Sequence, residues 1–126
     1  MKKKISSKKA PAAIGPYSQG IETENLIFLS GQIPLDPKTM QLVEGDENQI
    51  RQVFKNIDAL CTEVDLNMNH IVKLNVSLHD LSLFSLVNEI MKELFTEPYP
   101  ARAALQVARL PLDSSIEVEA ILAKTI

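Results

Sequence analysis

The chain has 126 residues, 45% of them hydrophobic, and a formal net charge of -3 at pH 7. This size and composition predict one compact domain spanning residues 1–126. The acidic balance argues against a nucleic-acid partner, because binding to a phosphate backbone depends on a positive surface field. A single cysteine cannot form an internal disulfide, and no apolar run is long enough for a membrane span, so we expect a protein of the reducing cytoplasm.

The N-terminal third has the composition of β structure. Residues 25–31 are apolar and run into Gly31, which is typical of a buried strand that ends in a turn. A second extended piece is expected before it, up to Ile21. The lysines among the first nine residues form a short charge run, which we interpret as solvated chain: Lys2, Lys3, Lys4, Lys8 and Lys9.

Two amphipathic helices are predicted in the middle of the chain. From Asp46 onward, apolar residues recur at the three- and four-residue spacing of a helix with one buried face. Asp46 is expected to cap this helix and Gln49 to complete a capping box. Cys61 lies in the apolar stripe, which favours a buried structural thiol over a nucleophile. A second helix is predicted over residues 82–95.

Three further strands complete the predicted fold. In residues 72–78, Val72 and every second residue after it are apolar and are expected to point inward; residues 103–108 and 116–123 are also extended. The order of strands, helix, strand, helix and strands predicts an α+β fold with both helices on one face of a sheet. Two helices cover only one face, so self-association is predicted to cover apolar residues on the other.

The chain carries none of the common short catalytic motifs. It contains no G-x-G-x-x-G, no Walker-type loop, no G-x-S-x-G, no H-E-x-x-H and no C-x-x-C. His70 and His79 are too isolated to form a metal site without several other ligands. We therefore expect neither a metal nor another cofactor.

Three charged side chains are candidates for chemistry. Glu117 and Glu119 lie two residues apart in a predicted strand and so point to the same face. If an interface encloses that face, repulsion and desolvation would raise the pKa of one of the two carboxyls and produce a base or a water-orienting group. On a solvated face, the two would be ordinary surface carboxylates. Arg102 follows Pro100-Ala101, and its guanidinium suits a substrate carboxylate, although an arginine taken alone more often forms an ordinary salt bridge.

Short blocks in the sequence resemble, in order, the signatures of the Rid (reactive intermediate deaminase, YjgF) family. The blocks are Ala13-Ile-Gly-Pro-Tyr-Ser-Gln19, Phe28-Leu-Ser-Gly-Gln32, Val87-Asn88, Tyr99-Pro-Ala-Arg102, Val107-Ala-Arg-Leu-Pro111 and Ile116-Glu-Val-Glu-Ala120. The resemblance implies a chorismate-mutase-like mixed sheet with two helices on one face. It also implies a homotrimer whose sheets form a central barrel, with active sites between subunits.

The resemblance further implies a hydrolase. Such an enzyme converts reactive 2-imino acids, formed from 2-aminoacrylate and 2-aminocrotonate, to 2-keto acids and ammonia, as a 2-iminobutanoate/2-iminopropanoate deaminase. Arg102 would bind the substrate carboxylate and Glu117 would position the attacking water. The remaining pocket residues implied by the resemblance are Tyr17, Ser30, Gly31, Asn88 and Ala104. For Tyr17 and Asn88, interface packing and helix-end hydrogen bonding are equally compatible roles.

The sequence departs from many relatives of this family at two places. Ala104 stands where many carry cysteine, so it would contribute only backbone groups. The loop over residues 96–100 is also shorter, which would alter substrate size preference. Alternative functions are a non-catalytic, metabolite-sensing trimer that binds small carboxylates, RNA cleavage, which the acidic balance opposes, and chorismate mutase activity, which rests on fold analogy alone.

Overall fold

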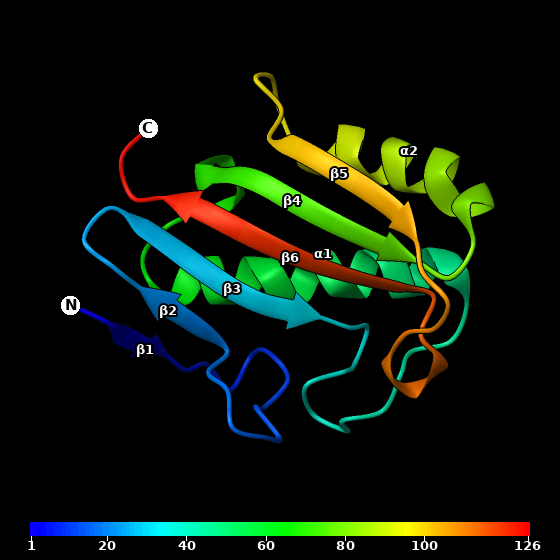
Figure 1. Ribbon diagram of the computed structural model, residues 1–126, viewed down its shortest axis with the longest axis horizontal. Coiled ribbons are helices and arrows are strands. Elements are labelled where there is room, and N and C mark those ends of the chain that lie inside the picture. Colours follow the sequence, from blue (N-terminus) through cyan, green and yellow to red (C-terminus); the bar gives the residue numbers. More distant parts are fainter.

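The computed structural model describes all 126 residues as one mixed sheet with two helices on one face (Figure 1). The helices are α1 (Asp46–Glu63) and α2 (Phe84–Leu94). The strands are β1 (Lys3–Ile5), β2 (Gly20–Glu22), β3 (Leu26–Gln32), β4 (Ile71–Leu78), β5 (Ala101–Gln106) and β6 (Ile116–Ala123), in the sheet order β1-β2-β3-β6-β4-β5. The predicted α+β fold is confirmed. No helix has both the length and the apolar character that crossing a membrane requires.

The parallel pair β4 and β5 determines where α2 lies. Leu74 pairs with Arg102 and Val76 with Ala104, and every other pairing in the sheet is antiparallel. Parallel neighbours need a crossover connection, which here contains α2. The crossover brings α2 onto the covered face beside β5, so side chains of β5 on that face meet α2.

The hydrophobic core fills the space between the sheet and the two helices. It includes the predicted apolar stripe of α1: Ile50, Val53, Phe54, Ile57, Leu60 and Cys61. The prediction of a buried Cys61 is confirmed. Burial, with a smaller contribution from the nearby Asp58 charge, raises the pKa of the Cys61 thiol to about 12, so it is no nucleophile at neutral pH.

The start of α1 differs from the predicted capping box. Gly45 is the N-cap residue and no side chain caps the helix. Instead, the Asp46 carboxylate accepts a 2.7 Å hydrogen bond from the Ser115 hydroxyl, and Gln49 Oε1 accepts one of 2.8 Å from the Ser115 backbone N–H. The capping prediction was wrong because both side chains bind the segment before β6, a contact that is distant in sequence.

The N-terminal lysine run is partly structured. Strand β1 pairs with β2 at the edge of the sheet, where Lys3 and Lys4 are exposed and Ile5 is buried. The lysine side chains are solvated as predicted, but Lys3 and Lys4 belong to a strand rather than to unstructured chain. Pairing with β2 and burial of Ile5 stabilise the strand, while the lysines discourage pairing with another edge.

Two irregularities in the pairing with β6 reset the direction of side chains. Between Leu29 and Gln32, β3 holds one residue more than β6. Between Ile71 and Lys73, β4 does the same, so Ile71 is buried and Val72 is exposed. The prediction that Val72 points inward was wrong because the bulge shifts the alternation by one residue.

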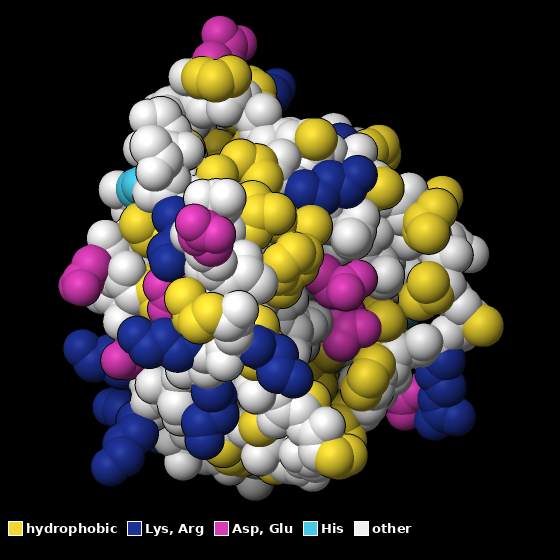
Figure 2. Space-filling model, turned by 60° about the vertical axis from the view of Figure 1, so that its left-hand side comes forward, with side chains coloured by type: hydrophobic (Ala, Val, Ile, Leu, Met, Phe, Trp, Pro, Cys, Tyr) yellow, Lys and Arg dark blue, Asp and Glu magenta, His cyan; other side chains and the backbone are white.

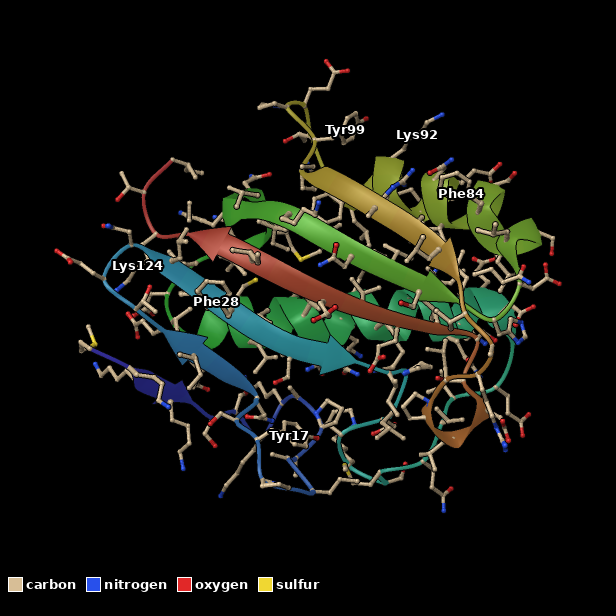
Figure 3. All side chains as sticks on the ribbon, viewed as in Figure 1. Tyr17, Phe28, Phe84, Lys92, Tyr99 and Lys124 are labelled. Atoms are coloured by element: carbon tan, nitrogen blue, oxygen red, sulfur yellow. The ribbon has the colours of Figure 1, made fainter.

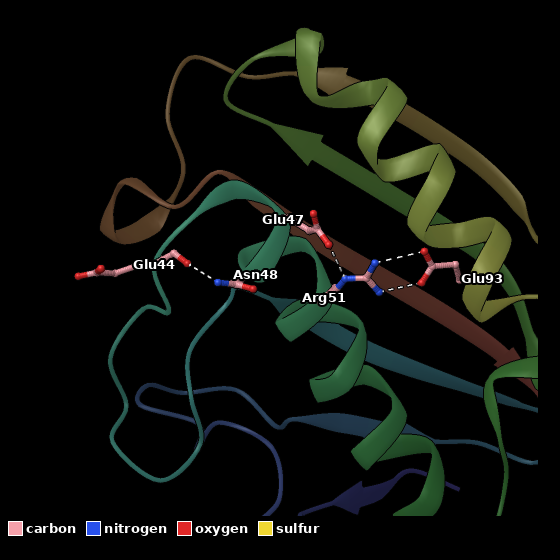
Figure 4. Close-up of polar contacts among 5 residues, drawn as sticks. All are labelled: Glu44, Glu47, Asn48, Arg51 and Glu93. Atoms are coloured by element: carbon pink, nitrogen blue, oxygen red, sulfur yellow. Dashed lines mark hydrogen bonds and ion pairs between the residues drawn. The ribbon is translucent and has the colours of Figure 1, made fainter.

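The two helices are joined on their outer side by an ion-pair network (Figure 4). The Arg51 guanidinium of α1 donates to both carboxylate oxygens of Glu93 in α2, at 2.9 and 3.2 Å, and its Nε donates to Glu47 at 3.0 Å. Exposed pairs of this kind add little to stability, because water solvates both charges and salt screens them. Their main effect here is to fix α2 relative to α1.

The second face of the sheet has no covering layer. Phe28 of β3 and Leu105 of β5 project from it and are 43% and 62% exposed. Figure 2 shows hydrophobic side chains gathered across one side of the molecule, with acidic groups among them and basic groups at the lower left. An uncovered sheet face with exposed apolar residues is therefore present, as the small number of helices predicts.

Candidate active site

Arg102 points to the covered face of the sheet, where α2 holds its guanidinium. Nη1 donates to Asn88 Oδ1 at 2.7 Å and makes a 3.5 Å contact with the sulfur of Met91. The guanidinium carbon also lies 4.7 Å from the centroid of the Phe84 ring. Nε and Nη2 donate to no protein group. One edge of a fixed guanidinium therefore stays free for the two parallel hydrogen bonds that a carboxylate accepts.

The hollow at Arg102 is cationic. It is lined by Asn88, Met91, Lys92, Tyr99, Pro100 and Arg102. Lys92 has no carboxylate within ion-pair distance, so the hollow holds two cations without a neutralising acid. Such a place favours an anionic group.

Glu117 lies on the uncovered face, in a different hollow. Tyr17, Ser30, Gly31 and Glu119 line this hollow with it, and most of the remaining lining is apolar. The Glu117 carboxylate accepts no hydrogen bond within the chain. Burial raises its pKa, and the neighbouring Glu119 charge raises it further. Glu117 is thus a stronger base than an ordinary surface glutamate.

The bulge in β3 places Ser30 and Gly31 beside Glu117. A Cβ atom on residue 31 would lie 2.7 Å from Glu117 Oε2, so glycine leaves the carboxylate its room. The Ser30 hydroxyl donates to the Ser18 carbonyl at 2.5 Å, which ties β3 to the loop that carries Tyr17. Tyr17 itself is 50% exposed at the edge of the hollow.

The predicted site residues therefore form two groups on opposite faces of one sheet. Arg102 pairs with Leu74, which points to the core, and Glu117 pairs with Ser77, which points the other way. Figure 3 shows Tyr17 far from Lys92 and Tyr99, at the opposite edge of the sheet. One chain does not bring Arg102 and Glu117 into a single cleft. Ala104 lies with the Arg102 group, half-buried against the core.

Known proteins resemble this chain over nearly its whole length. The model of the family described as Endoribonuclease L-PSP matches residues 7–124. The 2-iminobutanoate/2-iminopropanoate deaminase of Mus musculus is 46% identical over 122 residues, which cover 96% of this chain and 90% of that protein. RidA of an Antarctic Psychrobacter species is 49% identical with a TM-score of 0.94, covering 96% of this chain and 98% of that one. The chain belongs to the Rid family.

A further structure of a Rid-family protein contains a ligand. Escherichia coli TdcF with bound serine is 39% identical to this chain, with a TM-score of 0.93 and coverage of 98% and 99%. Serine carries a carboxylate and an amino group on one carbon, as a 2-imino acid carries a carboxylate and an imine nitrogen.

The sequence of this Rid-family chain did not predict several residues that surround the two hollows. Phe84 and Lys92 lie four residues on either side of Asn88, so the period of a helix already puts all three on one face. The helical period does not reveal that this face of α2 lies against β5. The crossover connection between β4 and β5 determines that contact. Ile14 and Leu112 line the hollow of Glu117, and neither shows any local signal.

Proposed function

We propose that this protein is an imine deaminase that hydrolyses 2-imino acids, formed from 2-aminoacrylate and 2-aminocrotonate, to 2-keto acids and ammonia. One observation carries the proposal: a fixed guanidinium with a free edge and an unpaired carboxylate of raised pKa occur in one small chain. The name of the mouse relative supports the reaction. Because a protonated imine is strongly electrophilic, its hydrolysis needs only a group that binds the substrate carboxylate and a modest base that aligns the water.

The proposed site lies between subunits of a homotrimer. Arg102 and Glu117 of one chain face opposite sides of its sheet, so a shared site needs Arg102 of one subunit and Glu117 of another. Closing the uncovered faces into a central barrel would also bury Phe28 and Leu105. Assembly and catalysis would then depend on the same surface.

The reaction balances without a cofactor. A protonated imino acid, R–C(=NH₂⁺)–COO⁻, and water yield R–CO–COO⁻ and NH₄⁺. Glu117 takes one proton from the water as the water oxygen bonds to the imine carbon, and it passes that proton to the nitrogen to give an –NH₃⁺ leaving group. Glu117 then takes the remaining hydroxyl proton as the C=O bond forms and the C–N bond breaks, and the departing ammonia accepts this proton to become NH₄⁺. Arg102 holds the carboxylate through Nε and Nη2.

The other residues support these two in the proposed site. Asn88 orients Arg102, and Gly31 gives Glu117 its room. Tyr17 and Ser30 would confine the ligand from the Glu117 side. Ala104 would contribute backbone groups, for which its side chain is immaterial.

The first test measures keto acid and ammonia release from freshly generated 2-aminoacrylate and 2-iminobutanoate. The protein should accelerate both reactions above the spontaneous rate, and Arg102→Ala should lose most of that acceleration. No acceleration by the wild-type protein would exclude the proposed function.

A second test asks whether each site uses two chains. Arg102→Ala and Glu117→Gln chains should each be inactive separately, whereas a refolded equimolar mixture should place the intact Arg102 of one variant against the intact Glu117 of the other. Random assembly predicts recovery of about one quarter of wild-type activity. A double variant carrying both substitutions serves as the control. Absence of recovery in mixed trimers would contradict a site shared between chains.

A metabolite-sensing trimer is the second candidate. The TdcF structure with bound serine favours it, because a small carboxylate can be bound without turnover. Glu117→Gln separates the two functions: affinity for a 2-keto acid persists in both, whereas turnover falls only if the protein is an enzyme. We do not propose RNA cleavage, although the family description names it, because the net charge of -3 provides no field for a polyanion.

A further inference from the structure

Two strongly exposed apolar side chains line the hollow of Glu117. Ile14 is 78% exposed and Leu112 is 63% exposed. They come from separate loops, one before Tyr17 and the other between β5 and β6. Large aliphatic groups at such exposure lose the benefit of burial unless something apolar covers them.

The backbone presents Leu112 in a conformation that leucine rarely adopts. Leu112 has φ 57° and ψ 21°, in the left-handed region, and Asp113 has φ 57° as well. The Asp113 carboxylate accepts hydrogen bonds from Arg109 Nε and Nη2 at 2.7 and 3.2 Å. The backbone N–H of Asp113 donates to the Leu110 carbonyl at 3.0 Å. Leu110 is buried, which anchors the turn. Leu112 is therefore held at a defined position beside the hollow.

The two hollows differ in polarity. The hollow of Arg102 is cationic, whereas the hollow of Glu117 is largely apolar beyond its carboxylates. Its apolar lining includes Ile14, Tyr17, Ile33, Leu35, Pro111 and Leu112. A 2-imino acid whose carboxylate is bound by Arg102, and whose imine carbon faces Glu117, directs its side chain away from the guanidinium. The apolar wall is the surface that remains for that side chain.

We propose that Ile14 and Leu112 form a side-chain subsite that selects 2-imino acids with longer aliphatic side chains over the smallest ones. This inference rests on the imine hydrolysis proposed above and names its preferred substrate class. Each methylene placed against the wall should raise kcat/KM roughly fourfold until the wall is filled.

The test is a chain-length series. Imines are generated by an amino-acid oxidase from alanine, 2-aminobutanoate and 2-aminopentanoate, and kcat/KM is measured for each. The wild-type protein should prefer the five-carbon imine by roughly tenfold or more over the three-carbon one. Leu112→Ser and Ile14→Ser should each reduce that ratio severalfold. Leu81→Ser is the matched control, since Leu81 is 45% exposed but lines neither hollow, and it should keep the wild-type ratio.

Different failures remain distinguishable. If the imines are hydrolysed but the ratio is flat, or both serine variants keep it, the subsite is wrong and the deaminase proposal stands. If no imine is hydrolysed, the deaminase proposal fails. The apolar subsite can still be tested by comparing the calorimetric affinities for pyruvate and 2-oxopentanoate, and equal affinities would overturn the subsite. If light scattering shows that Leu112→Ser changes the assembly state, Leu112 is an interface residue and the specificity role is overturned.

Discussion

The amide oxygen of Asn88 accepts a 2.7 Å hydrogen bond from the guanidinium of Arg102, so helix α2 determines where the free edge of Arg102 points. A helix that covers the core thereby positions the proposed anion-binding group.

Replacing Asn88 should act through Arg102. Asn88→Ala removes one hydrogen bond to a charged donor and should raise KM about tenfold, with a smaller effect on kcat. Asn88→Asp is the sharper variant, because a carboxylate at the same position would pair with the guanidinium and compete with the substrate. Steady-state kinetics should show a larger KM increase for Asn88→Asp than for Asn88→Ala. The reverse order would contradict a positioning role.

Arg102→Lys should not replace arginine. Lysine keeps the positive charge but has no planar pair of donors, so it cannot make two parallel hydrogen bonds with a carboxylate. We expect kcat/KM to fall about 10- to 100-fold in Arg102→Lys, and further in Arg102→Ala. Equal activity of Arg102→Lys and the wild-type protein would show that charge alone suffices.

Gly31→Ala should impair turnover more than stability. The added methyl group would lie 2.7 Å from Glu117 Oε2, and the flexible carboxylate would move aside at little structural cost. Displacing the base by even a fraction of an ångström should lower kcat at least tenfold. Gly15→Ala is the control, because its methyl group would meet only the Tyr17 ring at 3.6 Å, an ordinary contact. Thermal melts and kcat should be measured for both variants. An unchanged kcat in Gly31→Ala would contradict the proposal that Gly31 leaves room for the Glu117 base.

Glu119 should tune the acid limb of the pH profile. Burial and the Glu119 charge raise the pKa of Glu117 above 4.5, and the base must be ionised to act. Activity should therefore fall as pH drops through this raised pKa. Glu119→Gln removes one cause, so the acid limb of kcat/KM should move to lower pH. A limb that stays in place would mean that another group limits the rate.

Glu117→Gln should stabilise the fold at neutral pH. A carboxyl with a raised folded-state pKa contributes stability below its unfolded pKa and loses that contribution as pH rises through the folded pKa. Ionised Glu117 therefore destabilises the fold at pH 7, and Glu117→Gln should melt at a higher temperature than the wild-type protein there. The difference should vanish well below pH 4.5, where both side chains are neutral. Melting curves at both pH values provide the measurement, and a less stable variant at pH 7 would contradict the raised pKa.

The residue pattern alone determined the elements whose signal is local. Periods of 3.6 and 2 predicted α1 and β6 closely, including the buried Cys61 and the shared face of Glu117 and Glu119. Helix and strand geometry repeat from residue to residue, so such features depend little on the rest of the chain. The shortage of helices likewise predicted an uncovered sheet face.

Only the tertiary structure decided which partners meet. Asp46 binds Ser115 instead of capping its own helix, and the extra residue in β4 turns Val72 outward. The crossover through α2 puts Arg102 on the covered face, while Glu117 lies on the open one. Residues far apart in sequence are brought together by strand order, bulges and connections, and none of these leaves a periodic trace. The division of the candidate site into two halves was therefore visible only in the folded chain.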